Sequence, residues 1–182
     1  YPIIMNQNNI FFYIYTFFLY LIVQVLFLRY INFWGYAFCF AYIGYLLSFP
    51  LEFPRIPHLL IAFTIGIAID IFYDSAGIHA GACVFMIYFR KRNETTFSPT
   101  GYYEAGTQPC ISNMGSKWFL VYTSIMALFH HIFVFTVSAS NIALISNIIL
   151  KITFSVIFTS LTLFFFQRTG LSYKKYQLKR RR

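Results

Sequence analysis

The decisive stretch of this sequence is IFFYIYTFFLYLIVQVLFL, residues 10–28, which holds no charged residue and ends just before Arg29. A helix needs about 20 mostly apolar residues to cross a bilayer, at a rise of about 1.5 Å per residue. The stretch also lacks the basic start and the small-residue cleavage site of a secretory signal. It therefore predicts a transmembrane helix that is retained in the protein.

Apolar stretches of similar length follow along the chain. The further predicted spans are residues 32–49, 56–73, 76–89, 118–137 and 142–166. The span at 76–89 is short, because about 14 residues cover only about 21 Å of a hydrocarbon core about 30 Å thick. We expect an all-α integral membrane protein, with residues 1–182 forming a single transmembrane domain of about six helices.

The composition agrees with a lipid-embedded chain. Hydrophobic residues make up 59% of the sequence and charged residues 10%, and the chain contains 24 Phe and 15 Tyr. Soluble domains carry about 25% charged residues and about 45–50% apolar ones. A water-soluble fold has too little interior to bury this much aromatic surface, so the composition excludes that class.

Basic residues are distributed unevenly between the two sides of the predicted membrane. With six spans and both termini in the cytoplasm, most Lys and Arg fall on the inner side, in a loop at residues 90–117 and a tail at residues 167–182. Such asymmetry is typical of the positive-inside rule. A basic tail after an apolar span favours anionic lipids as its partner. The rest of the chain offers no basic face, which argues against nucleic acid.

One largely apolar stretch contains a cluster of ionisable residues: IGIAIDIFYDSAGIHA, residues 65–80. Asp70 and Asp74 are four residues apart and therefore share one helix face. One interpretation is a hydrogen-bonded turn, in which Asp74 and Ser75 cap the fourth helix and Asp70 pairs with a basic or hydroxyl group of a neighbour. The other is a direct role of both aspartates in an ion path or a partner contact.

Three further residues within predicted spans are candidates for buried polar contacts. His130 and His131 are adjacent, so they point about 100° apart and at most one of them faces any single site. Packing or interhelical hydrogen bonding is therefore favoured over metal binding for this pair. Lys151 lies near the middle of the sixth span, and its depth favours pairing with Asp70 or a tyrosine over snorkelling to the interface.

The sequence favours no enzyme. Membrane phosphatidyltransferases hold two Mg²⁺ ions with a longer aspartate motif than the pair found here, and five acidic residues in all are few for such sites. Nucleophile triads, phosphate-binding Gly loops and haem motifs are also missing from the sequence. We expect no catalytic residue, no metal and no cofactor, and we expect Cys39, Cys83 and Cys110 to be free thiols.

The same polar stretch resembles a known family. The pattern GxxxDIFxDSxGxHA, residues 66–80, closed by Tyr-Phe-Arg at residues 88–90, resembles the signature of the rod shape-determining protein MreD family. The specific part of the resemblance is about 25 residues long. The positions that match are Gly66, Asp70, Asp74, Gly77, His79 and Arg90. The resemblance implies that these residues shape a helix hairpin, and it implies a fold like that of the substrate-binding subunits of energy-coupling-factor transporters.

The resemblance also implies a function. MreD proteins are non-enzymatic components of the bacterial cell-elongation machinery in the cytoplasmic (inner) membrane, where they bind the bitopic protein MreC. Through MreC they join MreB, the RodA glycosyltransferase and the elongation transpeptidase during peptidoglycan synthesis. We expect small residues such as Gly44 and Gly66 to admit a partner helix. The alternative is a small-molecule or ion transporter or a substrate-binding membrane subunit, with Asp70, Asp74 and His79 lining a cavity.

Overall fold

The computed structural model of the chain is mostly helical. It describes residues 7–97, 108–139 and 145–169, and for residues 7–9 and 91–97 it gives the backbone alone. In chain order the elements are α1 (Gln7–Leu26), η1 (Leu28–Tyr30), β1 (Asn32–Phe33), β2 (Ala37–Phe38), α2 (Ile43–Leu47), α3 (Arg55–Tyr73), α4 (Ile78–Phe97), α5 (Ile111–Met114), α6 (Ser116–Val137) and α7 (Ile145–Arg168).

Four of these helices, α1, α3, α6 and α7, are long and apolar enough to cross a membrane. They lie over the predicted spans 10–28, 56–73, 118–137 and 142–166, with ends that differ by a few residues. Residues 142–144 of the last span lie outside the described part of the chain. The long apolar helices make this a membrane-embedded protein.

The predicted span 76–89 corresponds to α4. Its apolar part, Ile78–Arg90, is shorter than the four long spans and covers about 20 Å at 1.5 Å per residue. The helix packs against α3 on one side and against α6 on the other. Two neighbouring helices therefore cover a segment that is short for the bilayer.

The prediction of a continuous helix over residues 32–49 is wrong. A short antiparallel hairpin pairs Asn32 with Phe38 and Phe33 with Ala37, and only the five residues of α2 are helical further on. Gly35 and Trp34 turn the hairpin with φ of +75° and +50°. Hydropathy alone cannot separate a lipid-facing helix from irregular backbone buried inside a bundle, because both require apolar side chains.

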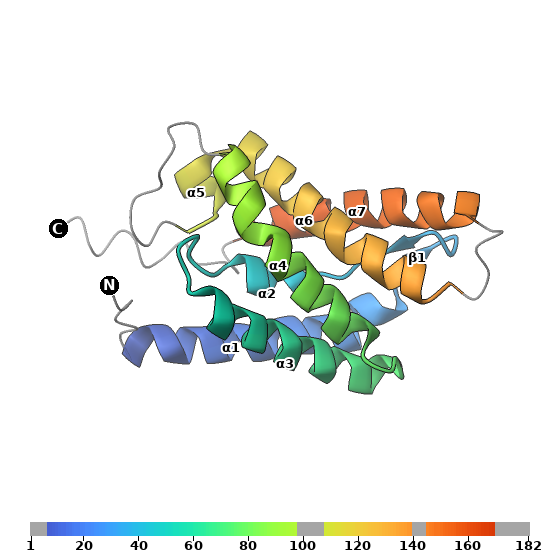
Figure 1. Cartoon of the computed structure of the whole chain (residues 1–182), viewed down its shortest axis with the longest axis horizontal. Helices are drawn as coiled ribbons and strands as arrows, with labels where there is room; N and C mark the ends of the chain where they lie inside the picture. The colour runs from blue at the N-terminus through green and yellow to red at the C-terminus, as the bar shows by residue number, and fades with distance from the viewer. Residues whose placement is uncertain (1–6, 98–107, 140–144, 170–182) are drawn as a thin grey trace.

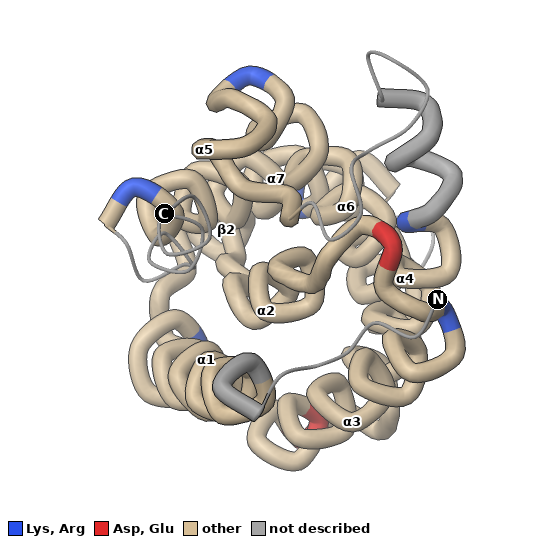
Figure 2. Tube along the Cα trace, turned by 90° about the vertical axis from the view of Figure 1, so that its left-hand side faces the viewer, with Lys and Arg blue, Asp and Glu red and all other residues tan. Residues whose placement is uncertain are grey.

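The irregular stretch runs through the middle of the molecule. In Figure 1, α1 begins and α7 ends at the same end of an elongated bundle, and the hairpin lies toward the opposite end. Viewed along the bundle in Figure 2, α2 lies at the centre and α1, α3, α4, α6 and α7 surround it. We call residues 36–50 the central segment.

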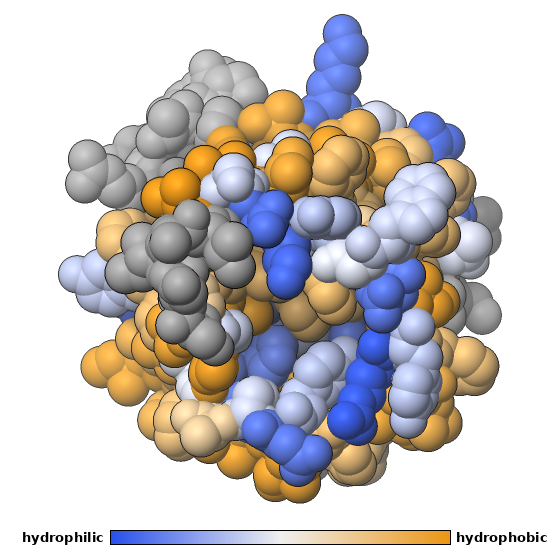
Figure 3. Space-filling model, turned by 90° about the vertical axis from the view of Figure 1, so that its right-hand side faces the viewer, coloured by the Kyte–Doolittle hydropathy of each residue, from blue (hydrophilic) through white to orange (hydrophobic). Residues whose placement is uncertain are grey.

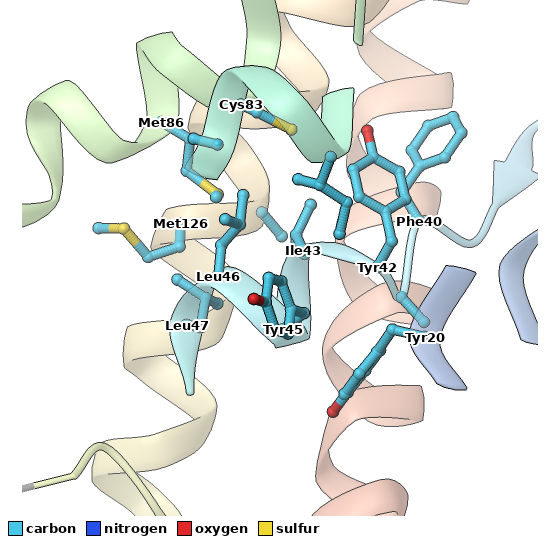
Figure 4. Close-up of a cluster of buried hydrophobic side chains, with 14 of the residues drawn as sticks. Tyr20, Phe40, Tyr42, Ile43, Tyr45, Leu46, Leu47, Cys83, Met86 and Met126 are labelled. Carbon is cyan, nitrogen blue, oxygen red and sulfur yellow. The ribbon is translucent and has the colours of Figure 1, made fainter. Parts of the chain in front are cut away.

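The core is built around this central segment. Every residue from 39 to 47 is buried, and the side chains of Tyr42, Ile43 and Leu46 have no exposed surface. Figure 4 shows Leu46 beside Met86 of α4 and Met126 of α6. The apolar content of residues 39–47 is thus explained by contact with surrounding helices, not with lipid.

Hydrophobic side chains also cover the outside of the bundle. On α1 and α7 the exposed ones include Phe11, Phe18, Phe154 and Phe165. Figure 3 shows the end of the bundle opposite to the start of α1, where hydrophilic side chains gather and hydrophobic ones surround them. An apolar belt with a polar end is the surface expected of a membrane protein. The predicted basic tail from residue 170 onward and residues 98–107 of the predicted loop lie outside the described residues.

Candidate functional site

The backbone of the central segment finds its hydrogen bonds on side chains of the surrounding helices. On α7, Ser155 Oγ accepts a bond from the Phe38 N–H at 2.9 Å, and Thr159 Oγ1 accepts one from the Phe40 N–H at 3.2 Å. Ser155 Oγ also donates to the Tyr36 carbonyl at 3.2 Å. These two hydroxyl groups, one helical turn apart, provide hydrogen bonds that a neighbouring strand would otherwise provide to this backbone.

Gln24 of α1 holds the same stretch from the other side. Its side chain is fully buried, and its Nε2 donates to the Cys39 carbonyl at 2.9 Å and to the Tyr73 hydroxyl at 2.8 Å. Its Oε1 accepts a bond from the Tyr42 N–H at 3.4 Å. One amide side chain therefore satisfies a backbone donor and a backbone acceptor, and also ties the central segment to α3.

The far end of the central segment is held by Arg90 and His58. Arg90 Nη2 donates to the Phe49 carbonyl at 2.6 Å, and Arg90 Nε donates to the Tyr122 hydroxyl at 2.8 Å. Arg90 Nη1 lies 2.9 Å from His58 Nδ1, and His58 Nε2 lies 3.0 Å from the Leu46 carbonyl. A guanidinium only donates, so Nδ1 must accept and Nε2 must carry the proton that bonds to the carbonyl. His58 is therefore neutral in this arrangement.

These contacts explain how irregular backbone exists inside a membrane protein. Within a bilayer each unsatisfied backbone group costs several kcal/mol, so a non-helical stretch must be buried in protein and supplied with partners. Gln24, His58, Arg90, Ser155 and Thr159 supply those partners, and they come from four different helices. The central segment and these five side chains form the main polar network of the described interior.

Asp70 lies at the turn between α3 and α4. One carboxylate oxygen, Oδ1, accepts bonds from Ser75 Oγ at 2.6 Å and from the His79 N–H at 2.9 Å, and Oδ2 accepts one from the Ala80 N–H at 2.9 Å. These N–H groups belong to the first turn of α4, where no intrahelical partner exists. Asp70 thus satisfies the start of α4 and carries a negative charge at the favourable end of the helix dipole.

The prediction that Asp74 and Ser75 cap α4 is wrong, because Asp70 is the residue that accepts the hydrogen bonds from the start of α4. Asp74 is exposed and ends α3 in the left-handed conformation, with φ +51°. Ser75 donates to Asp70 and does not itself accept a bond from α4. Gly77, with φ +82°, completes the reversal so that Asp70 can reach across it. The hydroxyl partner predicted for Asp70 is Ser75, a near neighbour in sequence.

Gly66 and Gly44 allow close contacts within the chain itself. A Cβ on Gly66 would meet the Ala80 Cα and, at 2.7 Å, the Ala80 nitrogen, so α3 and α4 touch backbone to backbone. A Cβ on Gly44 would meet the Leu163 side chain and, at 3.0 Å, the ring of Tyr20. The prediction that these two positions admit a partner helix is therefore wrong, because the chain fills both contacts itself.

Two of the buried histidines, His79 and His130, meet at Tyr42. The Tyr42 hydroxyl lies 2.9 Å from His79 Nδ1 and 2.6 Å from His130 Nε2, which joins α4 to α6 through the central segment. His131 Nδ1 bonds to the Ala127 carbonyl at 2.6 Å, and its Nε2 lies 3.2 Å from Thr159 Oγ1. The two adjacent histidines thus face different partners. His130 Nδ1 is buried and has no partner among the described residues.

Lys151 does not pair with Asp70. Its side chain is half-buried on α7, and among the described residues no ion pair joins it to that carboxylate. The acceptor capacity of Asp70 is taken up by Ser75 and by the backbone of α4. The hypothesis of an Asp70–Lys151 pair is therefore wrong.

Several residues of this network were not singled out from the sequence. Gln24, Tyr42 and His58 lie in apolar stretches, where each is an isolated polar group among hydrophobic neighbours. Ser155 and Thr159 are four residues apart on α7, a spacing that places two hydroxyls on one face. An uncharged polar residue inside a predicted span is the signal that identifies such partners.

The three cysteines add no cross-link to the described structure. Cys39, Cys83 and Cys110 are free thiols, as predicted, and burial raises the pKa of Cys110 above its usual value. Within residues 7–97, 108–139 and 145–169, no three His, Cys, Asp or Glu side chains are placed to hold a metal ion. Most polar groups of the network are paired with one another, which leaves them committed to holding the fold.

Comparison with known proteins gives no match: no family model, no curated protein and no solved structure is similar to this chain.

Proposed function

We propose that the protein is a non-enzymatic membrane scaffold that binds partner helices through its outer surface. The observation that supports this is the filling of the interior by the central segment. A subunit that binds a small molecule needs a cavity with converging polar groups, commonly about 300–1,000 Å³ in volume. Here the chain itself occupies the centre of the bundle, and its own backbone uses the polar side chains that point inward.

The cavities at the edge of the central segment are small. One of about 10 Å³ lies beside Gly44 and Thr123, and one of about 110 Å³ lies beside His58 and Arg90. Neither approaches the volume of a drug-sized ligand site. The surface left for macromolecular contact is the apolar outside of the bundle, where α1 and α7 expose Phe11, Phe18 and Phe154.

The resemblance to MreD gives the proposal its particular form. The scaffold acts in the bacterial cell-elongation (rod shape) complex of the cytoplasmic membrane, where it binds an MreC-like bitopic protein. RodA, the elongation transpeptidase and MreB are reached through that partner, and the basic tail contacts anionic lipid. We further propose six passages through the membrane, five helical and one formed by the central segment, with both termini in the cytoplasm and an arrangement like that of energy-coupling-factor substrate-binding subunits.

The test is photocrosslinking from chosen faces of the bundle in native membranes. A photoreactive residue replaces Phe18 on the outside of α1 or Ile157 on the outside of α7, and the control replaces the buried Leu46. We expect an adduct with a bitopic membrane protein from at least one outer position and none from position 46. Mass spectrometry identifies the adduct, and recovery of elongation enzymes with it supports the proposal.

The rival function is a transporter or substrate-binding subunit. The observation in its favour is the buried chain of hydrogen bonds from His79 through Tyr42 to His130, which ends on an unpartnered ring nitrogen. Buried polar chains of this kind occur in proton and ion pathways. Adducts with transporter ATPases, without elongation enzymes, would contradict the scaffold proposal and favour this one.

A further inference from the structure

A cavity of about 110 Å³ lies at the end of the bundle where α3 begins. The turn before α3 forms one wall through Leu51 and Glu52, and the first turn of α3 and the middle of α4 form the others. The volume exceeds the roughly 30 Å³ of one water molecule and falls well below a drug-sized ligand site. It suits a small head group.

Two guanidinium groups line this cavity, and both are held in place. Arg90 is only 3% exposed and is fixed by Tyr122, His58 and the Phe49 carbonyl. Arg55 donates to the Tyr88 carbonyl at 3.0 Å and stacks over the Tyr88 ring, with 4.3 Å from its central carbon to the ring centroid. Fixed guanidinium groups bind a phosphate with little loss of side-chain entropy.

A carboxylate of opposite charge lines the same cavity. Glu52 is exposed, and among the described residues it forms no ion pair with Arg55, although both side chains border the same space. His58 is neutral because Arg90 donates to its Nδ1. The cavity therefore presents acidic and basic groups that do not neutralise each other by direct contact. A ligand with both an anionic and a cationic group fits this arrangement.

An apolar stripe leads away from the cavity along α3. Ile56, Leu60, Phe63, Ile67 and Ile71 are exposed and recur every three or four residues, so they form one continuous face of the helix. Ile56 follows Arg55 directly, and the stripe therefore starts beside the cavity. Acyl chains are the ligand part that such a stripe accommodates, which favours a lipid over a free head group.

We propose that this cavity binds the head group of a phospholipid that carries a primary ammonium beside its phosphate, as phosphoethanolamine does. Arg55 donates to the phosphate, Arg90 adds positive charge at the inner wall while its nitrogens stay bonded to the protein, Glu52 accepts hydrogen bonds from the ammonium, and the acyl chains lie along the apolar stripe of α3. The site is separate from the network around the central segment except for Arg90 and His58, which belong to both.

The experiment compares lipids bound to the full chain purified in detergent, counted by native mass spectrometry. Dioleoylphosphatidylethanolamine and dioleoylphosphatidylcholine have the same phosphate and acyl chains, but only the first has N–H donors. We expect about fivefold greater retention of the ethanolamine lipid, which corresponds to about 1 kcal/mol for one partly exposed charge-assisted contact. Equal retention of the two lipids overturns the proposal.

Exposed positions give variants that leave the fold intact. Glu52→Gln is expected to lower retention of the ethanolamine lipid to that of the choline lipid without changing the latter, whereas Arg55→Gln weakens both. Lys117→Gln, an exposed cation outside the cavity, serves as the matched control and is expected to change neither. A Glu52→Gln protein that still prefers the ethanolamine lipid contradicts the assignment. If free O-phosphoethanolamine displaces the bound lipid at equal concentration, the ligand is a free head group, and the proposal of a lipid is overturned.

Discussion

The α3–α4 hairpin and the central segment solve the same problem in different ways. Both must satisfy backbone groups in the interior of a membrane-embedded bundle. In the hairpin, Asp70 reaches Ser75, His79 and Ala80 across the turn at residues 74–77, and Gly66 lets the two helices touch. In the central segment, several backbone groups rely on side chains from other parts of the chain, up to 121 positions away for the Phe38 carbonyl and Thr159.

The two regions differ in how many side chains share the hydrogen bonding of the backbone. In the hairpin, one carboxylate, Asp70, accepts all three of these side-chain hydrogen bonds, so a single substitution there removes them together. The central segment is held by Gln24, His58, Arg90, Ser155 and Thr159 together, so the loss of one leaves four in place. We therefore expect large effects of substitution in the hairpin and graded effects around the central segment.

The largest effect is expected for Gly66→Ala. The added methyl group would overlap backbone atoms of Ala80, which cannot rotate away as a side-chain end does. We expect the protein to lose more than about 3 kcal/mol of stability, at or above the upper range for overpacking. Thermal unfolding in detergent measures the loss.

The matched control is Gly44→Ala in the central segment, where the new methyl group meets the Leu163 and Tyr20 side chains. These side chains can shift, so about 1 kcal/mol is expected. If the two variants unfold at the same temperature, the contrast between backbone contact and side-chain contact is lost.

Asp70→Ala is expected to have the next largest effect. It leaves two N–H groups at the start of α4 and one hydroxyl without their acceptor, which costs about 2–3 kcal/mol for a buried cap. Asp70→Asn retains one acceptor oxygen and should lose about half as much. Asp74→Asn, at an exposed carboxylate, is the control and should leave the unfolding temperature unchanged. A greater loss for Asp74→Asn than for Asp70→Asn would contradict the capping role of Asp70.

Gln24→Leu tests the central segment. The substitution keeps the volume of the side chain but removes the partners of the Cys39 carbonyl and the Tyr42 N–H. We expect a loss of about 1–2 kcal/mol, less than for Asp70→Ala, because the other four side chains still hold the segment. Thr64→Val, which removes only an exposed hydroxyl bonded within its own helix, is the comparison. A loss for Gln24→Leu as large as that for Asp70→Ala would show that the network is not shared as we argue.

The smallest effect is expected for Thr159→Val. Removing one hydroxyl should cost about 0.6 kcal/mol, the average for a hydrogen bond between membrane helices. The clearer readout is hydrogen exchange, in which the Phe40 amide should lose protection while amides of α3 keep theirs. Thr162→Val removes a bond within α7 and should leave Phe40 protected. Unchanged exchange at Phe40 in the Thr159 variant would remove Thr159 from the network.

The contrast between the two regions also explains what the sequence could predict. The spans that became α1, α3, α6 and α7 were recognisable because hydropathy over about 20 residues is a local signal. The polar turn at residues 70–80 was recognisable for the same reason, since Asp70, Ser75 and Gly77 lie close together in the chain. The cap was wrongly assigned to Asp74 and Ser75 because they directly precede the predicted fourth span, the usual place of an N-cap, whereas Asp70 reaches α4 from the last turn of α3.

The central segment was not predictable from local pattern. Residues 32–49 are as apolar as a lipid-facing helix, and what prevents a continuous helix there is the supply of hydrogen-bond partners elsewhere. Nothing in the local sequence around Ser155 or Gln24 predicts that these side chains bond to the backbone of Phe38 or Cys39. The same limit applies to Lys151, for which depth in the span suggested a pairing with Asp70 that the described residues do not form.

The reach of the central segment toward α7 has a consequence for how the protein is made. The amides of Phe38 and Phe40 donate hydrogen bonds to hydroxyls of residues that lie 117 and 119 positions later in the chain and are therefore synthesised later. At about 5–20 residues per second, a ribosome needs roughly 6–24 s to synthesise the intervening chain. During that interval residues 36–50 lack their final partners on α7, and a transient helix is the form that would keep their backbone satisfied in a bilayer. The arrival of α7 would then unwind that helix, so the central segment would be the last part of the bundle to reach its mature shape.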